Sequence, residues 1–123
     1  MGRASKEVGA HGEELAAKHL AANGYRVLDR NWRWRQGELD LVAEKGGEVV
    51  FVEVKARRSH AFGTPEEAVT RVKQRKLIRT AQAYLARQGR QADPWRIDVI
   101  ALDLNAQGEL VRLEHLENAV GQG

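Results

Sequence analysis

The sequence predicts an α/β fold: a mixed five-stranded sheet flanked by helices on both faces, with the element order α-β-β-β-α-β-β. Two observations predict it. Residues 37–55 hold two stretches of alternating apolar and polar residues around Gly46-Gly47, the pattern of a hairpin closed by a two-residue turn. Residues 5–23 and 71–87 carry their apolar side chains at helical spacing instead. The 123 residues suffice for one domain, expected over residues 1–123.

The first helix and first strand are predicted from signals in the N-terminal part of the chain. The helix is expected over residues 5–23, where Asn23-Gly24 provides a stop signal. Gly9 and Gly12 weaken this helix locally, so we expect its backbone to approach a neighbouring element closely there. A strand is predicted to follow over residues 25–30.

The elements after the hairpin are predicted in the same way. Residues 57–63 form a polar loop, and Thr64-Pro65-Glu66-Glu67 is a capping box with proline at the first helical position. The main second helix is expected over residues 71–87, with Thr70 as an alternative cap. Its predicted core stripe consists of Leu77, Ile78, Ala81, Tyr84 and Leu85. Two final strands are predicted over residues 95–103 and 109–115.

Composition excludes several classes of function. The chain has no cysteine, which rules out disulfides, thiolate zinc sites and cysteine nucleophiles. Charged residues interrupt every apolar stretch before it could span a membrane, and residues 1–6 lack the apolar core of a signal peptide. We therefore expect a cytoplasmic protein with no membrane partner. The four histidines show no metal-ligand spacing, and neither serine has the setting of a nucleophile elbow.

The hairpin register brings acidic side chains together. If Lys45 faces Glu48 across the turn, Asp40 lies directly opposite Glu53. Strand alternation then distributes the remaining side chains between two faces. The acidic face also carries Glu38, opposite Lys55, whereas the other face carries Leu39, Leu41, Ala43, Val50, Val52 and Val54. Two facing carboxylates destabilise a sheet unless positive charge lies between them.

A divalent cation such as Mg²⁺ or Mn²⁺ would supply that charge at Asp40 and Glu53. Such an ion activates water and stabilises charge on a phosphate, and Lys55, on the same face, could assist the attack. The sequence therefore predicts a phosphodiesterase site with Asp40, Glu53 and Lys55 as its catalytic residues. The alternative is a structural salt bridge between Lys55 and an acid on a solvated face. We favour the metal site, since this face continues with the apolar residues Val42, Val49 and Phe51.

Three accessory residues are candidates for the same site. Glu13, beside Gly12 on the first helix, could be a third metal ligand or an ordinary exposed glutamate. Glu38 shares the face of the acidic pair. Lys73, at the edge of the second helix's core stripe, could reach the site or a phosphate, or remain solvated.

Basic residues suggest a nucleic-acid partner. The net charge is +3, and residues 71–91 contain seven basic residues and no acidic one. Arg71, Arg75 and Arg79 recur every fourth residue as a ridge, which either binds phosphates or is a solvated face. Trp32 and Trp34 could stack on unpaired bases, but we favour packing against a helix. The candidate nucleic-acid contacts are Arg33, Arg57, Arg71, Lys73, Arg75, Lys76 and Arg79.

Several short motifs together resemble the YraN family of bacterial endonuclease-like proteins. They are Gly9-x-x-Gly12-Glu13-x-x-Ala16, Asn31-x-Arg33, Gly37-Glu38-Leu39-Asp40-Leu41, Val50-Phe51-Val52-Glu53-Val54-Lys55-x-Arg57, Phe62-Gly63-x-Pro65, Lys73 and Arg96-x-Asp98-Val99. That family looks like a member of the PD-(D/E)xK nuclease superfamily and is similar to archaeal Holliday-junction resolvases. Here Leu39, rather than the superfamily's proline, precedes Asp40.

The resemblance implies a restriction-endonuclease-like fold and Mg²⁺- or Mn²⁺-dependent cleavage of DNA, including branched or recombination and repair structures. It makes Asp40 and Glu53 metal ligands, Lys55 the catalytic lysine and Glu13 an accessory acid. Analogy with resolvases favours a homodimer. The rival interpretation is a nucleic-acid-binding or scaffold module that keeps the fold without catalysis.

Overall fold

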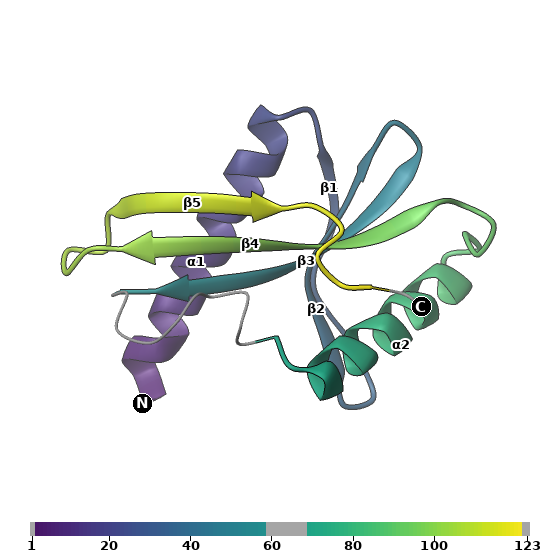
Figure 1. The fold of residues 1–123 in the computed structure, drawn as a ribbon, viewed down its shortest axis with the longest axis horizontal. Helices are drawn as coiled ribbons and strands as arrows, with labels where there is room; N and C mark the ends of the chain where they lie inside the picture. Colours follow the sequence, from purple (N-terminus) through teal and green to yellow (C-terminus); the bar gives the residue numbers. More distant parts are fainter. Residues whose placement is uncertain (1, 59–68, 122–123) are drawn as a thin grey trace.

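The computed structural model describes residues 2–58 and 69–121, and for residues 2–7 it describes the backbone alone. The elements are α1 (Gly2–Ala22), β1 (Arg26–Trp34), β2 (Gly37–Lys45), β3 (Glu48–Arg57), α2 (Arg71–Arg87), β4 (Trp95–Leu104) and β5 (Leu110–Leu116) (Figure 1). The predicted order of elements is confirmed. The capping box at Thr64 and the Phe62-Gly63-x-Pro65 motif lie outside the described residues. Neither helix has a stretch long and apolar enough to cross a bilayer within the described ranges.

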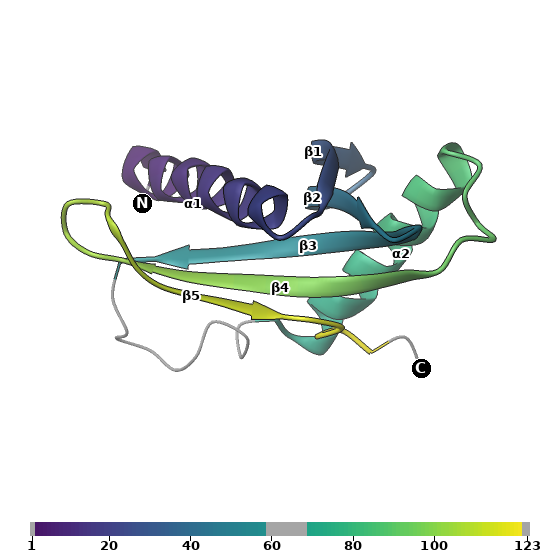
Figure 2. The same cartoon turned by 90° about the horizontal axis from the view of Figure 1, so that it is seen from above.

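The five strands form one sheet in the order β1-β2-β3-β4-β5. Only β3 and β4 are parallel, while the other three neighbouring pairs are antiparallel, so the sheet is mixed as predicted. A parallel pair needs a crossover connection, and here α2 lies in it. Figure 2 shows α1 on one side of the sheet and α2 on the other. The predicted mixed sheet with helices on both faces is therefore confirmed.

Two buried layers hold the helices on the sheet. The layer under α1 is built from Ala16, Ala17, Leu20, Tyr25, Leu41, Ala43, Val50, Val52, Ile100 and Leu102. The layer under α2 is built from Leu39, Val42, Val49, Phe51, Val69, Leu77, Ala81, Tyr84, Leu85, Ile97, Val99 and Val120. Successive residues of β3 alternate between the two layers, because strand side chains point to opposite faces. Burial of these apolar side chains on both faces stabilises the fold by about 25 cal/mol for each Å² of apolar surface removed from water.

Gly12 lets α1 approach the sheet closely, and Thr70 marks where α2 begins. A Cβ on Gly12 would lie 2.5 Å from Ala56 Cβ on β3, which confirms the predicted close approach at Gly12. Gly9 makes no such approach, since a Cβ there would have no neighbour within 4 Å among the described residues. The second helix spans Arg71–Arg87 as predicted, and its N-cap is Thr70, whose hydroxyl accepts from Lys73 N at 3.2 Å.

The first strand is longer than the sequence predicted. It continues past Arg30 to Trp34, because Trp32 and Trp34 pair with Leu39 and Gly37 across β2. A tight turn at residues 35–36 then leads into β2. Sequence reasoning missed this hairpin because the turn holds neither glycine nor asparagine, the residues that normally mark one.

Candidate metal and nucleic-acid site

The β2–β3 hairpin has the predicted register. Lys45 pairs with Glu48, and the ladder runs to the Leu41–Val52 pair. At the next position the carboxylate of Asp40 replaces a main-chain acceptor, because its Oδ2 accepts from Val54 N at 2.8 Å. This contact anchors the Asp40 side chain at the point where β2 leaves β3.

Two details of the predicted face are wrong, because the ladder ends at Leu41. Leu39 was expected beside Leu41, but it packs in the layer under α2. Glu38 was expected opposite Lys55, but it pairs with Arg33 on β1, and the two side chains form an ion pair of 3.0 Å. Beyond Leu41, β2 therefore follows β1 rather than β3, and simple alternation from the hairpin fails there.

The two acids of the site, Asp40 and Glu53, are largely shielded from solvent. Glu53 is only 6% exposed. Burial, a hydrogen bond with Glu53 and the charge of Glu53 raise the pKa of Asp40 to about 8, while the Val54 N–H and Lys55 act in the opposite direction. A carboxyl with this pKa holds its proton at neutral pH unless a cation takes its place. The structure thus brings the side chains of Asp40 and Glu53 within interaction distance, although the β2–β3 ladder ends at Leu41–Val52, before the predicted Asp40–Glu53 pair.

Two lysines stand beside the acidic pair. Lys73 Nζ lies 3.7 Å from Glu53 Oε2, so a residue of α2 reaches the site from across the groove. Burial and a hydrogen bond with Lys73 lower the pKa of Lys55, although Glu53 opposes this. Burial also acts to lower the pKa of Lys73, but the interactions with Lys55, Glu53 and Asp40 raise it overall. Lys55 is therefore the lysine whose proton is more easily released.

Glu13 on α1 lies close enough to Asp40 to feel its charge. Burial and the charge of Asp40 raise its pKa, and a hydrogen bond with Asn31 opposes the shift. Asn31 has a φ of 51° and lies between the Arg30–Leu41 and Trp32–Leu39 pairs, which is beside Asp40 in this register. Among the described residues no three His, Asp or Glu side chains are close enough to hold one metal ion. Glu13 is thus near the acidic pair without joining it in a three-residue cluster.

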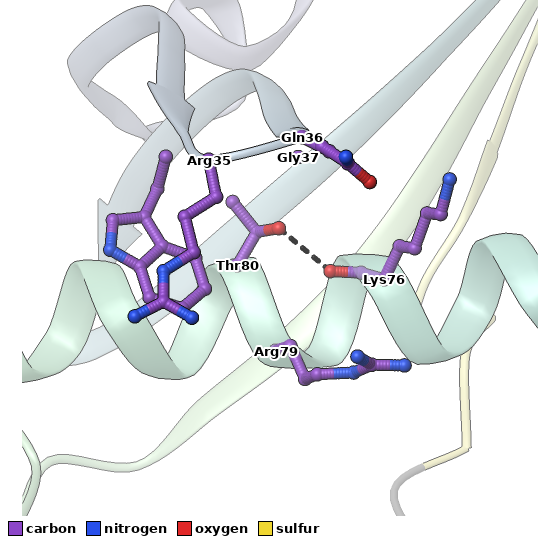
Figure 3. Close-up of a pocket in the computed structure, with 7 residues that line it drawn as sticks. Arg35, Gln36, Gly37, Lys76, Arg79 and Thr80 are labelled. Carbon is purple, nitrogen blue, oxygen red and sulfur yellow. Dashed lines mark hydrogen bonds between the residues drawn. The ribbon is translucent and has the colours of Figure 1, made fainter.

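Beside these side chains lies a groove between the sheet and α2. One cavity of about 420 Å³ contains Asp40 and Glu53. Its wall is formed by Gln36, Gly37, Glu38, Thr70, Val72, Lys73, Lys76, Leu77 and Thr80. A neighbouring cavity of about 330 Å³ shares Gln36, Gly37, Lys76 and Thr80 with it and extends to Trp34, Arg35 and Arg79 (Figure 3). The groove therefore runs from the acids to the β1–β2 turn.

The predicted basic contacts fall into two groups. Arg71, Arg75, Lys76 and Arg79 are exposed on α2, and two of them, Lys76 and Arg79, line the groove. Arg33 and Arg57 already have acidic partners. The first pairs with Glu38, and the Nε of Arg57 donates to Asp103 Oδ1 at 2.9 Å. The basic residues of α2 are thus better placed to meet a phosphate.

Sequence reasoning missed a second buried acid. Asp98 on β4 is fully buried, and its carboxylate accepts from Arg96 Nε at 3.0 Å and from Asn118 N at 2.8 Å. His115 Nε2 lies 2.8 Å from Asp98 Oδ2, and His115 Nδ1 lies 3.1 Å from His19 Nε2. The Arg96-x-Asp98 motif was the only signal for this network, and nothing in the local pattern predicted His19 and His115 as neighbours.

Comparisons with known proteins identify the family. The model of UPF0102, described as an uncharacterised protein family, matches residues 12–102. A UPF0102 protein of Symbiobacterium thermophilum is 50% identical over 115 residues, covering 94% of this chain and 97% of that protein. One from Beutenbergia cavernae is 50% identical over 114 residues, covering 93% and 96%. The chain belongs to the UPF0102 family, also called YraN, which confirms the predicted resemblance.

Solved structures give more distant likenesses. The chain is similar to EndoMS in a complex with double-stranded DNA, with a TM-score of 0.46, 18% identity and coverage of 78% of this chain and 38% of that one. It is also similar to Pyrococcus furiosus SfsA in complex with Ca²⁺, with a TM-score of 0.41, 17% identity and coverage of 92% and 63%. The family assignment depends on the sequence matches and not on these two likenesses.

Proposed function

We propose that this UPF0102 protein is a nuclease that uses Mg²⁺ or Mn²⁺ to hydrolyse phosphodiester bonds in DNA, including branched or recombination and repair structures. One observation carries the proposal. Burial and the neighbouring Glu53 raise the pKa of Asp40 to about 8 even with Lys55 nearby, and this acidic pair opens onto a groove with basic side chains.

The donor set fits a hard divalent cation. Asp40 and Glu53 offer carboxylate oxygens only, which suits Mg²⁺ or Mn²⁺. Mg²⁺ is commonly held by one or two protein carboxylates together with water and substrate phosphate. A third protein ligand is therefore not required, and Glu13 would act as an accessory acid. When bound, the ion supplies an activated water and stabilises charge on the phosphate.

The chain's own residues would perform the remaining tasks. Lys55, with its lowered pKa, would orient the attacking water or stabilise the charge that develops on the phosphate. Lys73, next to Glu53, would neutralise a phosphate oxygen entering the groove. The buried setting of Glu53 would limit bulk water around the reacting groups.

A cleavage assay tests this proposal. Single-stranded, duplex, flapped and four-way DNA would each be incubated with Mg²⁺ or Mn²⁺. We expect cleavage by the wild type and a loss of at least about 100-fold in Asp40→Asn and Glu53→Gln. Glu109→Gln, which changes an exposed acid in the β4–β5 turn, is the matched control and should cleave normally. Binding of these DNAs without cleavage under any condition would favour the scaffold alternative. Light scattering of the same samples tests the expected homodimer.

A second assay tests whether the ridge of Arg71, Arg75 and Arg79 holds the phosphate backbone. Fluorescence anisotropy of labelled DNA would be measured across a salt series for the wild type and for a triple alanine variant. Each lost phosphate contact should reduce the log–log salt slope by about one, with little dependence on base sequence. Lys18→Ala, which removes an exposed lysine of α1, is the matched control. An unchanged slope in the triple variant would leave the ridge as a solvated face.

A further inference from the structure

The β1–β2 turn presents an aromatic side chain to the groove. Trp34 and Arg35 line the smaller cavity, and Arg35 Cζ lies 4.5 Å from the centre of the Trp34 indole, a cation–π contact. Trp34 is half-buried and Arg35 is exposed. Trp32 is different, because it packs edge-on against Tyr84 in the layer under α2, with ring centres 5.2 Å apart. The predicted packing role thus describes Trp32, whereas Trp34 faces a cavity.

The backbone of this turn packs tightly against α2 at Gly37 and has a positive φ at Arg35. A Cβ on Gly37 would collide with Thr80 Oγ1, so only glycine allows the turn to approach the helix so closely. The Thr80 hydroxyl donates to Lys76 O at 2.7 Å (Figure 3). Arg35 has a φ of 55°, which glycine or asparagine adopts more readily than arginine does. The turn therefore carries an arginine where glycine would be less strained.

The cavity has the charge of a nucleic-acid contact. Arg35 from the turn, together with Lys76 and Arg79 from α2, gives it three cations, and no acidic residue is among the described residues that line it (Figure 3). Proteins that bind single strands combine such cations with an aromatic ring on which a base stacks. Bases also stack on the planar guanidinium of arginine. The indole and guanidinium of this turn offer both surfaces as one stacked pair.

We infer that Trp34 and Arg35 form a stacking subsite for an unpaired nucleobase of a single-stranded segment. This inference rests on the proposed function of the neighbouring acids. Gly37 and Asp40 are three residues apart on β2, which is about 10 Å in an extended strand, and the two cavities share a wall. A strand with one phosphate at Asp40 can therefore place a nearby base on the stacked pair. A duplex must first unpair to do so, at a cost in free energy. The preferred substrates are single strands, overhangs and flaps.

Binding measurements test the subsite separately from cleavage. The Asp40→Asn background prevents hydrolysis, and anisotropy would compare a thymidine oligonucleotide of about 12 nucleotides, its uridine RNA counterpart, an abasic DNA of equal length and a blunt duplex. Trp34→Ala should weaken binding of the thymidine oligonucleotide about tenfold and leave the abasic DNA unchanged. Trp34→Phe should keep most of the affinity. Trp32→Phe is the matched control, because Trp32 is on the same strand but packs in the layer under α2. It should bind as the parent does.

Arg35→Gly separates recognition from folding. Glycine accepts the positive φ, so the melting temperature should not fall while binding of the thymidine oligonucleotide weakens. Equal affinities of the Trp34→Ala and parent proteins for that oligonucleotide would overturn the inference, as would equal losses on thymidine and abasic DNA or no binding at all. A base preference that depends on Trp34, in a wild type that cleaves nothing, would support the subsite and reject the nuclease. Comparing the DNA and RNA arms shows which single strand the subsite prefers.

Discussion

Two buried acidic centres lie on neighbouring central strands of this sheet, and they differ in how their charge is balanced. Asp98 on β4 pairs with Val52 of β3, one residue before Glu53, so the centres are close along the sheet. Asp98 has hydrogen bonds from Arg96 and Asn118 and a contact with His115. Although burial acts to raise the pKa of Asp98, these partners lower it overall.

The partners of the Asp40–Glu53 centre balance its charge less completely. One backbone N–H and the nearby lysines do not outweigh burial and the second carboxyl, so the pKa of Asp40 rises to about 8. The contrast teaches how to separate structural acids from candidate ligand sites. An acid whose charge is fully met by protein groups stabilises the fold, whereas a buried pair that repels itself stores free energy that a cation can release.

The largest expected effect is at the balanced centre. Asp98→Asn should lower the free energy of unfolding by about 3 kcal/mol, because it leaves the mostly buried Arg96 without its fully buried carboxylate partner. Urea unfolding at pH 7 measures this loss. Glu117→Gln is the matched control, since Glu117 also pairs with Arg96, at 3.3 Å, but is 62% exposed. It should change stability by less than about 0.5 kcal/mol. Similar effects of the two substitutions would remove the distinction between the centres.

At the Asp40–Glu53 centre we expect a substitution to stabilise the protein rather than destabilise it. Without divalent metal, Asp40→Asn should raise the free energy of unfolding at pH 8 by about 2 kcal/mol, because it removes one of two facing charges. The native pKa of about 8 lies above the unfolded value of 3.8. The native state therefore holds a proton that the unfolded state has lost, and wild-type stability falls as pH rises from about 4 to 8. Urea titrations at pH 4, 6 and 8 should show that the difference in unfolding free energy between the two proteins grows as the pH rises. A less stable variant at pH 8 would contradict this interpretation.

Binding of a divalent metal should restore the stability that repulsion between Asp40 and Glu53 removes. At pH 8 and ten times its Kd, Mg²⁺ or Mn²⁺ should stabilise the wild type by about 1.4 kcal/mol through binding to the native state alone. Thermal unfolding with and without metal, beside an EDTA control, measures the shift. Asp40→Asn should show little of it, and Glu109→Gln should show all of it. Equal stabilisation of all three proteins would place metal binding elsewhere.

The sequence predicted most of the fold because its signals were local. The Gly46-Gly47 turn set the hairpin register, and the apolar spacing and Thr70 set the second helix. The errors came where tertiary contacts override local pattern. Leu39 changes layer after the carboxylate of Asp40 takes over the Val54 N–H, and Arg35 forms a tight turn because Gly37 packs on Thr80. The proximity of Asp40 and Glu53 followed from register alone, whereas Lys73 at Glu53 and Asn31 at Glu13 needed the packed helices.

The smallest expected effect is a pH dependence of stability that arises at His19 on α1 and runs in the opposite direction to that at Asp40. Burial and the neighbouring His115 lower the pKa of His19 below its ordinary value of 6.5. The unfolded state therefore gains a proton before the native state does, so this contribution to stability is present above pH 6.5 and is lost as pH falls through the native pKa. His19→Gln should flatten the decline of stability between pH 7 and 5 by less than about 1 kcal/mol. NMR titration of the imidazole gives the direct test, and a native pKa at or above 6.5 would refute it. The Asp40 dependence should persist in this variant, because the pKa of His19 is lowered by burial and His115 rather than by Asp40.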